Sequence, residues 1–292
     1  MIQMDSIKLC FACLLIGLVL NGNCEVSSHA VSTLDSSTSG TTTLTIDEIQ
    51  QYRDDRYHIF QESLSEAQLS QEHRDLIAHA LSKTYSGVPL CSFSFSLDAR
   101  GDKALPSEEE AVWIVPESGG TEREGNEDRR HYRDSPISYI PDNPFDVAQG
   151  SVVAESKSSV KFRFPLTPRL IAPNLHSDAV RVLRKVDWVA ELTVDPEEQA
   201  PISLLLTLAS DDGRAQAPLV NVDVARVEFL YQYNDSCQFY EVFSKMRLFK
   251  GSSLFSGDFL DQTIKTFKNV KCGQPVAFLL PDKKELEFIE RY

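Results

Sequence analysis

The chain has 292 residues and a formal net charge of −14, with 43 acidic side chains against 29 basic ones. Such an acidic protein repels nucleic acids and anionic membranes, so we expect no nucleic-acid partner and no stable membrane insertion. Its length suits one large β-rich domain or two small ones.

The first 24 residues have the pattern of a cleavable secretory signal. Lys8 supplies a positive charge, and an unbroken apolar run of twelve residues, LCFACLLIGLVL, follows from Leu9 to Leu20. A run of this length fits a signal-peptide core and is well short of the roughly 20 residues that span a bilayer. Gly22 and Cys24 are small residues where a signal peptidase reads, so we predict cleavage at the end of residues 1–24 and a secreted, extracellular protein.

The next two segments are predicted to be a tether and a pair of helices. Residues 25–44 are rich in Ser and Thr and have little to bury, so we expect a flexible tether. Residues 45–87 carry apolar residues at helical spacing, which predicts a helical hairpin. Its helices are expected to begin with capping boxes at Thr45 and Ser65, each followed three residues later by Glu or Gln.

Residues 88–292 change to an apolar period of two, which predicts an antiparallel β-rich domain. The clearest strand places Phe93 and Phe95 on one face and serines on the other. Short polar turns between the strands favour antiparallel pairing. Further strands are expected near residues 111–115, 160–164, 186–194, 202–209, 220–233, 240–248 and 275–280.

Three places in this region depart from simple alternation. Residues 107–144, approximately, mix both charges with glycine and lack apolar periodicity, so we expect a disordered acidic loop inserted between strands. A change of phase near Arg226 interrupts the strand at 220–233. In residues 258–270, Leu260, Ile264 and Phe267 fit a helix.

The cysteines indicate one disulfide in the mature chain. Cys91, Cys237 and Cys272 remain after the predicted cleavage, and in an oxidising compartment two of them are expected to pair. Cys237 and Cys272 are closest in sequence, and we predict that they form the bond. Cys91 lies in an alternating strand and is expected to be buried and reduced. These three cysteines have no CxxC spacing and no nearby pair of histidines, so we expect no zinc site and no cofactor.

Two tripeptides match known recognition motifs. Asn234-Asp235-Ser236 is the sole N-glycosylation acceptor and lies at a predicted turn, so a glycan on Asn234 and a plain turn are both open interpretations. Arg100-Gly101-Asp102 follows a predicted strand and matches an adhesion motif that works at loop tips. A glycine turn flanked by charges explains Arg100, Gly101 and Asp102 equally well, and we favour that interpretation.

The sequence carries no catalytic signature. It lacks a GxSxG elbow, a P-loop, a dinucleotide fingerprint and an HExxH pair. We therefore assign no catalytic residue and no metal ligand, and we expect a binding protein rather than an enzyme.

These patterns predict an α+β, β-rich fold: an N-terminal helical hairpin followed by an antiparallel β-sandwich or barrel-like sheet. Our leading hypothesis is a secreted non-enzymatic interaction protein with an extracellular protein partner. One alternative is a carrier that holds a small apolar ligand in a β-barrel cavity lined by inward aromatics such as Phe162 and Trp188, although such residues more often fill a core. A second alternative is a secreted hydrolase whose catalytic residues are dispersed in sequence.

Overall fold

The structure is a computed structural model, and it describes most of the region from Thr41 to Leu279. The predicted signal peptide, its cleavage site before Glu25, and both Cys91 and Cys272 lie outside the described residues. The described residues are 41–44, 46–84, 92–101, 109–114, 121–123, 126–128, 136, 147–166, 183, 186–210, 214–217, 219–255, 257–271 and 276–279.

Two α-helices precede most of the strands: α2 (Ile46–Ser63) and α3 (Gln71–Ser82). The second begins later than the sequence suggested, because Ser70 is its N-cap and the Ser70 Oγ accepts the His73 N–H at 3.2 Å. The predicted cap at Ser65 is therefore wrong, since the Ser65 N–H donates to the Glu62 carbonyl in the turn that leaves α2. The other predicted cap, Thr45, lies outside the described residues.

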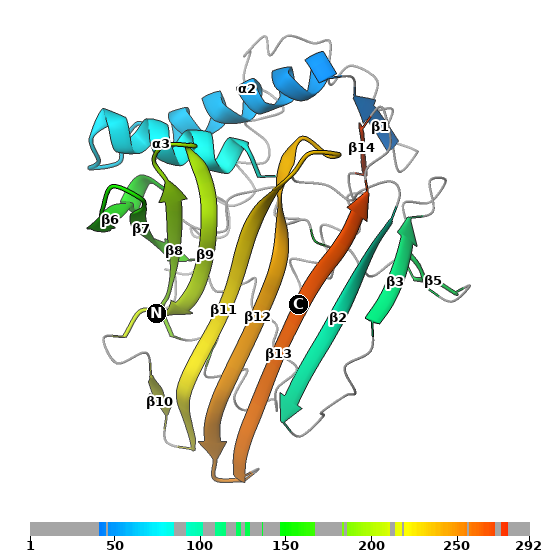
Figure 1. The fold of residues 1–292 in the computed structure, drawn as a ribbon. Coiled ribbons are helices and arrows are strands. Elements are labelled where there is room, and N and C mark those ends of the chain that lie inside the picture. The colour runs from blue at the N-terminus through cyan, green and yellow to red at the C-terminus, as the bar shows by residue number, and fades with distance from the viewer. Residues whose placement is uncertain are drawn as a thin grey trace, which may run out of the picture. The chain divides into compact units, whose positions relative to one another are not determined.

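The described strands form a mostly antiparallel sheet, which confirms the β-rich prediction. Eleven strands follow one open path in the order β5-β4-β3-β2-β13-β12-β11-β9-β8-β7-β6, and β10 beside β11 is the twelfth strand of this sheet, while β1 and β14 form a separate pair (Figure 1). The strands are β1 (Thr41–Leu44), β2 (Ser92–Gly101), β3 (Glu109–Ile114), β4 (Thr121–Arg123), β5 (Asn126–Asp128), β6 (Ser151–Glu155), β7 (Val160–Leu166), β8 (Trp188–Asp195), β9 (Ala200–Leu208), β10 (Ala215–Ala217), β11 (Val220–Asn234), β12 (Phe239–Ser253), β13 (Gly257–Lys271) and β14 (Val276–Leu279); one 3-10 turn, η2, spans Val147–Gln149.

Residues 258–270, whose apolar spacing fits a helix, form strand β13 instead. It pairs with β12 on one side and β2 on the other, so backbone ladders on both sides outweigh the local helical spacing. Phe259 and Phe267 are both buried, as expected of residues an even number apart on one strand. Leu260, an odd step from Phe259, is exposed.

Other strands form where the sequence suggested irregular chain. Strands β3, β4 and β5 lie within residues 107–144, which were predicted to be a disordered loop. Strand β1 occupies the end of the predicted tether at 25–44 and pairs with β14. Backbone pairing gives these segments an order that side-chain composition does not indicate.

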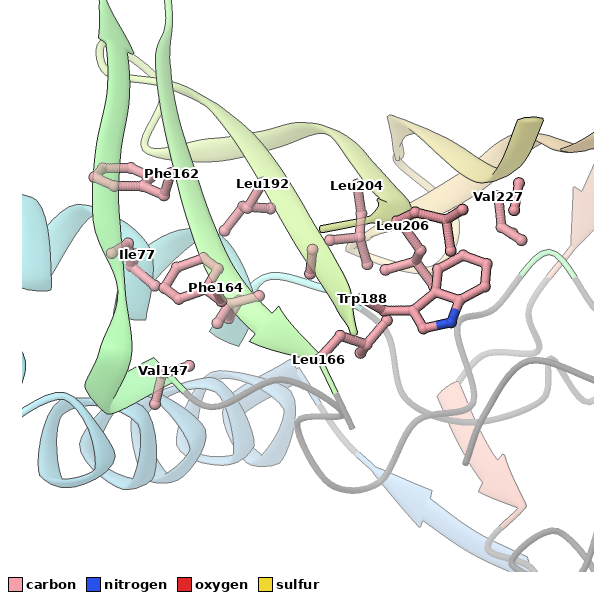
Figure 2. Close-up of a cluster of buried hydrophobic side chains, with 14 of the residues drawn as sticks. Ile77, Val147, Phe162, Phe164, Leu166, Trp188, Leu192, Leu204, Leu206 and Val227 are labelled. Carbon is pink, nitrogen blue, oxygen red and sulfur yellow. The ribbon is translucent and has the colours of Figure 1, made fainter. Parts of the chain in front are cut away.

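The core lies on one face of the sheet, where α3 contacts β8 and β9. Figure 2 shows Ile77 of α3 near Phe162 and Phe164 of β7, and all three side chains are fully buried. Trp188 belongs to the same cluster and donates its Nε1–H to the Leu183 carbonyl at 2.9 Å. Each such side chain contributes roughly 1.5–3 kcal/mol by leaving water. A smaller cluster comprises Phe93, Phe95, Val242 and Phe267.

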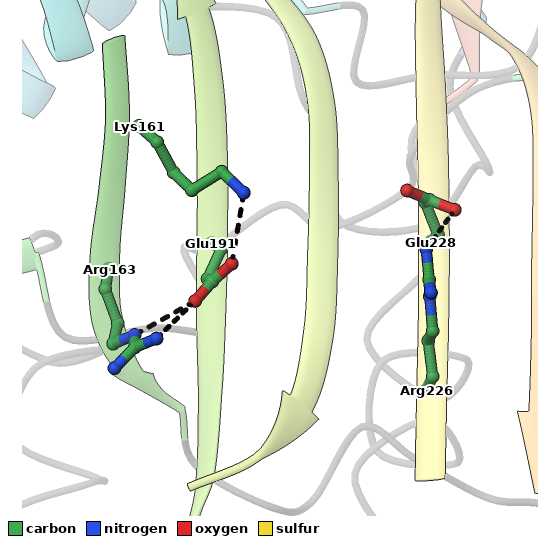
Figure 3. A network of polar contacts seen from close by, with 5 residues as sticks. All are labelled: Lys161, Arg163, Glu191, Arg226 and Glu228. Atoms are coloured by element: carbon green, nitrogen blue, oxygen red, sulfur yellow. Dashed lines mark hydrogen bonds and ion pairs between the residues drawn. The ribbon is translucent and has the colours of Figure 1, made fainter. Parts of the chain in front are cut away.

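The opposite face of β7 and β8 carries ion pairs. Figure 3 shows Lys161 and Arg163 on β7 reaching Glu191 on β8, with Arg163 Nη2 at 2.6 Å and Lys161 Nζ at 3.5 Å from its oxygens. On β11, Arg226 Nη2 lies 2.9 Å from Glu228 Oε2. Glu191 is buried, while both cations that reach it are at least partly exposed. These ion pairs indicate a polar outer face beside the buried alternation of Phe162 and Phe164.

Candidate functional site

The longest strands of the sheet end in two different turns. β11, β12 and β13 have 15 residues each, a length of roughly 50 Å at about 3.3 Å per residue. One turn, at residues 235–238, joins β11 to β12; the other, at residues 254–256, joins β12 to β13. In Figure 1 the second turn lies at the end of the sheet farthest from α2 and α3.

The β12–β13 turn exposes large apolar side chains. Leu254 is 74% exposed and Phe255 is 72% exposed, and Leu219, at the start of β11, is 46% exposed. The Leu254 N–H donates to the Leu219 carbonyl at 2.9 Å, which holds the three residues side by side. We call Leu219, Leu254 and Phe255 the apolar tip.

The chain directly below the apolar tip is closely packed. Val222, Ser253 and Phe259 are buried there. A Cβ on Gly251 would lie 2.1 Å from the Asn221 carbonyl oxygen and 2.6 Å from Phe259 Cζ, so only glycine fits at this position. At the start of β13, Gly257 has a φ of +71°, a conformation that favours glycine. The apolar tip therefore stands on a well-anchored base.

Charged side chains of both signs lie near the apolar tip. Asp223 lies in the exposed bulge of β11, and Asp258 follows the tip by three residues. Lys250 is an exposed cation on the neighbouring stretch of β12, and Arg214, also exposed, directly precedes Ala215, which pairs with β11 beside the same bulge. This surface is thus apolar at its centre and of mixed charge at its rim.

The β11–β12 turn is organised by Asn234. The Asn234 Nδ2 donates to Glu241 Oε2 at 2.6 Å and to the Val270 carbonyl at 3.3 Å. The Asn234 Oδ1 accepts the Ser236 N–H at 2.9 Å, the Ser236 hydroxyl at 2.7 Å and the Cys237 N–H at 3.1 Å. Asn234 thus connects the turn to β12 and β13.

Glu241 is a buried carboxyl beside this turn, with 5% of its surface exposed. Its Oε1 also accepts the Gln232 Nε2 at 2.8 Å. Burial raises the pKa of Glu241, and the hydrogen bonds from Gln232 and Asn234 oppose that shift. Burial is the largest cause, so the carboxyl holds its proton to a higher pH than an exposed one.

Cys237 lies in the same turn and is disulfide-bonded in the structure. Every other cysteine lies outside the described residues, so the pairing of Cys237 with Cys272 and the reduced state of Cys91 stay predictions. The contact between Asn234 and Val270 places the turn close to the end of β13, two residues before Cys272.

The adhesion-like tripeptide lies at the end of a strand. Arg100 and Gly101 pair with Gln262 and Asp261 in the ladder between β2 and β13, and Asp102 lies outside the described residues. Arg100 Nη2 is 3.5 Å from Asp98 Oδ2 on the same strand. Two of the three motif residues therefore belong to regular sheet and not to a loop.

A polar cluster joins the two helices. Asp75 Oδ1 accepts hydrogen bonds from the Tyr57 hydroxyl at 3.3 Å and from Gln61 and Gln71 at 2.8 Å each. His79 stacks on Tyr57 with 4.3 Å between ring centroids. Burial raises the pKa of Tyr57 and lowers that of His79. Because these contacts bridge α2 and α3, the cluster serves to hold the helices together.

The described part of the chain contains no group of three His, Cys, Asp or Glu side chains that would hold a metal ion. None of its helices has the length and apolar character needed to cross a bilayer.

Sequence reasoning missed the apolar tip. The available signal was the pair Leu254-Phe255 between Ser252-Ser253 and Ser256-Gly257, where a turn predicts polar residues. Comparison with protein-family models, curated proteins and solved structures found no match. Function must therefore be inferred from the surfaces of the chain itself.

Proposed function

We propose that this chain is a secreted, non-enzymatic binding protein that engages an extracellular protein through its apolar tip. The observation that carries the proposal is the exposure of 74% of Leu254 and 72% of Phe255 at adjacent positions. A single exposed apolar residue needs no explanation, whereas a contiguous group marks an interaction site. Aromatic and apolar anchors of this kind supply most of the affinity in protein interfaces.

The packed base supports this proposal. Val222 and Phe259 are buried directly beneath the apolar tip, so the tip projects from a packed base. An anchor on a packed base favours affinity, because the strands that carry it need little ordering on binding.

A protein partner explains the charge of the chain better than a lipid surface does. The whole chain carries a net charge of −14, which repels anionic headgroups. Asp223 and Asp258 border the tip together with Lys250 and Arg214. This mixed rim matches an apolar pocket surrounded by charged side chains of both signs, because opposite charges favour encounter and docking.

The carrier alternative has less support. It requires a sandwich or barrel-like curvature that encloses a cavity, while the described strands follow an open path from β5 to β6. Phe162, Phe164 and Trp188, which would line the cavity, are buried among other apolar side chains of the same core. We therefore favour binding at the apolar tip.

Site-specific photocrosslinking in the native extracellular fluid tests the proposal. A benzophenone side chain replaces Phe255 in one protein and Ile59 in another; Ile59 is 60% exposed on α2 and is the matched control. We expect a protein adduct at position 255 and none at position 59.

Binding measurements with the crosslinked partner complete the test. Phe255→Ser should weaken its affinity at least about tenfold, since truncating a central interface anchor costs about 2 kcal/mol or more and about 1.4 kcal/mol is tenfold, and Ile59→Ser should leave it unchanged. The same adducts at both positions, or binding to neutral lipid vesicles without any protein adduct, would contradict the proposal.

A further inference from the structure

The amide group of Asn234 is fully engaged inside the folded protein. Its Nδ2 donates at 2.6 Å to Glu241 and at 3.3 Å to the Val270 carbonyl. An amide nitrogen has two hydrogens, so both of its donors are in use. The acceptor, Oδ1, receives three further hydrogen bonds from Ser236 and Cys237.

A glycan would have to be attached to this same nitrogen. N-glycosylation forms a bond from Nδ2 to a sugar carbon and removes one of the two hydrogens. The group that Nδ2 faces at 2.6 Å is Glu241, which is 5% exposed, so a sugar cannot follow that direction to solvent. One hydrogen bond would be lost, and a buried carboxyl would lose a donor.

We infer that glycosylation of Asn234 and closure of the β11–β12 turn are mutually exclusive, and that the sequon is unmodified in the folded protein. Asn234 is a structural residue that joins the turn to Glu241 and Val270. The polar residues of Asn234-Asp235-Ser236 serve the hydrogen bonds of the turn. The same turn contains the disulfide-bonded Cys237, so modification of Asn234 would also disturb the setting of that bond.

Secretion of the full chain from a glycosylating eukaryotic host tests the inference. The intact mass before and after peptide N-glycosidase treatment should be the same for the wild type, and the peptide containing Asn234 should be unmodified. The matched control is Lys157→Asn, which completes an Asn-Ser-Ser sequon in the exposed turn between β6 and β7. This variant should gain one glycan, showing that the chain meets the glycosylation machinery.

A second variant distinguishes two reasons why Asn234 could be unmodified: closure of the turn, and a sequon that the glycosylation machinery uses poorly. Glu241→Ala removes the carboxyl that faces Nδ2 and should allow a glycan on a measurable fraction of the secreted molecules. A glycan on Asn234 of the folded, disulfide-bonded wild type would overturn the inference. An unmodified Glu241→Ala variant beside a modified Lys157→Asn variant would overturn turn closure as the cause.

Discussion

The two turns that flank β12 differ in what they do with their side chains. Before Phe239, Asn234 at the end of β11 directs its polar side chain inward to Glu241 and Val270, and Cys237 of the β11–β12 turn is disulfide-bonded. After Ser253, the β12–β13 turn directs its apolar groups outward, with Leu254 and Phe255 mostly exposed. In each case one or two residues depart from the usual partition, which places polar side chains outside and apolar side chains inside.

This departure from the usual partition has a different explanation at each of the two turns. Buried polar groups stabilise a turn when they are hydrogen-bonded to each other, so the Asn234 turn is explained by folding alone. Exposed apolar groups gain nothing from folding, and Phe259 already fills the base of the second turn. Changes at the Asn234 turn should therefore alter stability, whereas changes at the apolar tip should alter binding.

The largest predicted contrast is between two phenylalanines four residues apart. Phe259→Ala should lower the free energy of unfolding by about 3–5 kcal/mol, because Phe259 is 8% exposed and its removal leaves a cavity. Phe255→Ala should change it by less than about 0.5 kcal/mol, as an exposed substitution does. Urea denaturation with the disulfide intact measures both, and equal losses would mean that Phe255 is part of the core.

At the other end, Asn234→Ala should lower the free energy of unfolding by about 2–4 kcal/mol. The substitution removes several hydrogen bonds, one of them to a buried carboxyl, and bonds to charged groups are worth about 1.5–3 kcal/mol. Asp235→Ala is the control, because Asp235 is exposed, and it should stay within about 0.5 kcal/mol of the wild type. Similar losses for the two variants would show that Asn234 has no special structural role.

Because the base of the apolar tip is closely packed, even a methyl group added at Gly251 should lower stability. Gly251→Ala should cost about 1–3 kcal/mol of stability, because the new Cβ meets the Asn221 carbonyl and the Phe259 ring. Thermal unfolding followed by circular dichroism measures the loss. An unchanged midpoint would mean that the base yields easily and that the apolar tip is not rigidly held.

The raised pKa of Glu241 should make the free energy of unfolding depend on pH. Burial raises its pKa from the ordinary value of 4.5, so in this range the folded chain keeps a proton that the unfolded chain releases. This carboxyl stabilises the fold fully below pH 4.5, its ordinary pKa. The stabilisation is lost as the pH rises through the raised pKa of the folded chain.

The comparison with Glu241→Gln isolates this effect, because glutamine does not titrate. The wild-type unfolding free energy should fall relative to that of the variant as the pH rises above 4.5. Parallel pH profiles for the two proteins would contradict a raised pKa at this position.

Much of the sheet could be predicted from period-two patterns. Phe162, Phe164 and Trp188 lie in strands and are buried, as their alternation suggested. The expected phase change near Arg226 appears as a register shift between Val222 and Val224. Such patterns succeed because one face of each strand meets the core and the other meets solvent.

The sequence was less informative wherever tertiary pairing decides the structure. β13 contains residues at helical spacing, yet it forms a strand because β12 and β2 flank it on both sides. β1 and β3 lie in segments whose composition suggested irregular chain. Ser70, not Ser65, caps α3, although only Ser65 is followed three residues later by Glu or Gln.

The sequence could not predict the apolar tip or the structural role of Asn234 for a related reason. Leu254 and Phe255 resemble core residues in sequence, and only their exposure in the folded chain distinguishes them from Phe259. Asn234 resembles a glycan acceptor in sequence, and only its contact with Glu241 reveals a structural role. Both distinctions depend on residues that the fold brings together.

The most direct test measures affinity and stability together for Phe255→Ser, using the partner crosslinked at position 255. The account predicts an affinity at least about tenfold weaker than that of the wild type, with a free energy of unfolding unchanged within about 0.5 kcal/mol. An unchanged affinity, or a loss of affinity accompanied by an equal loss of stability, would contradict a binding surface that is separate from the fold.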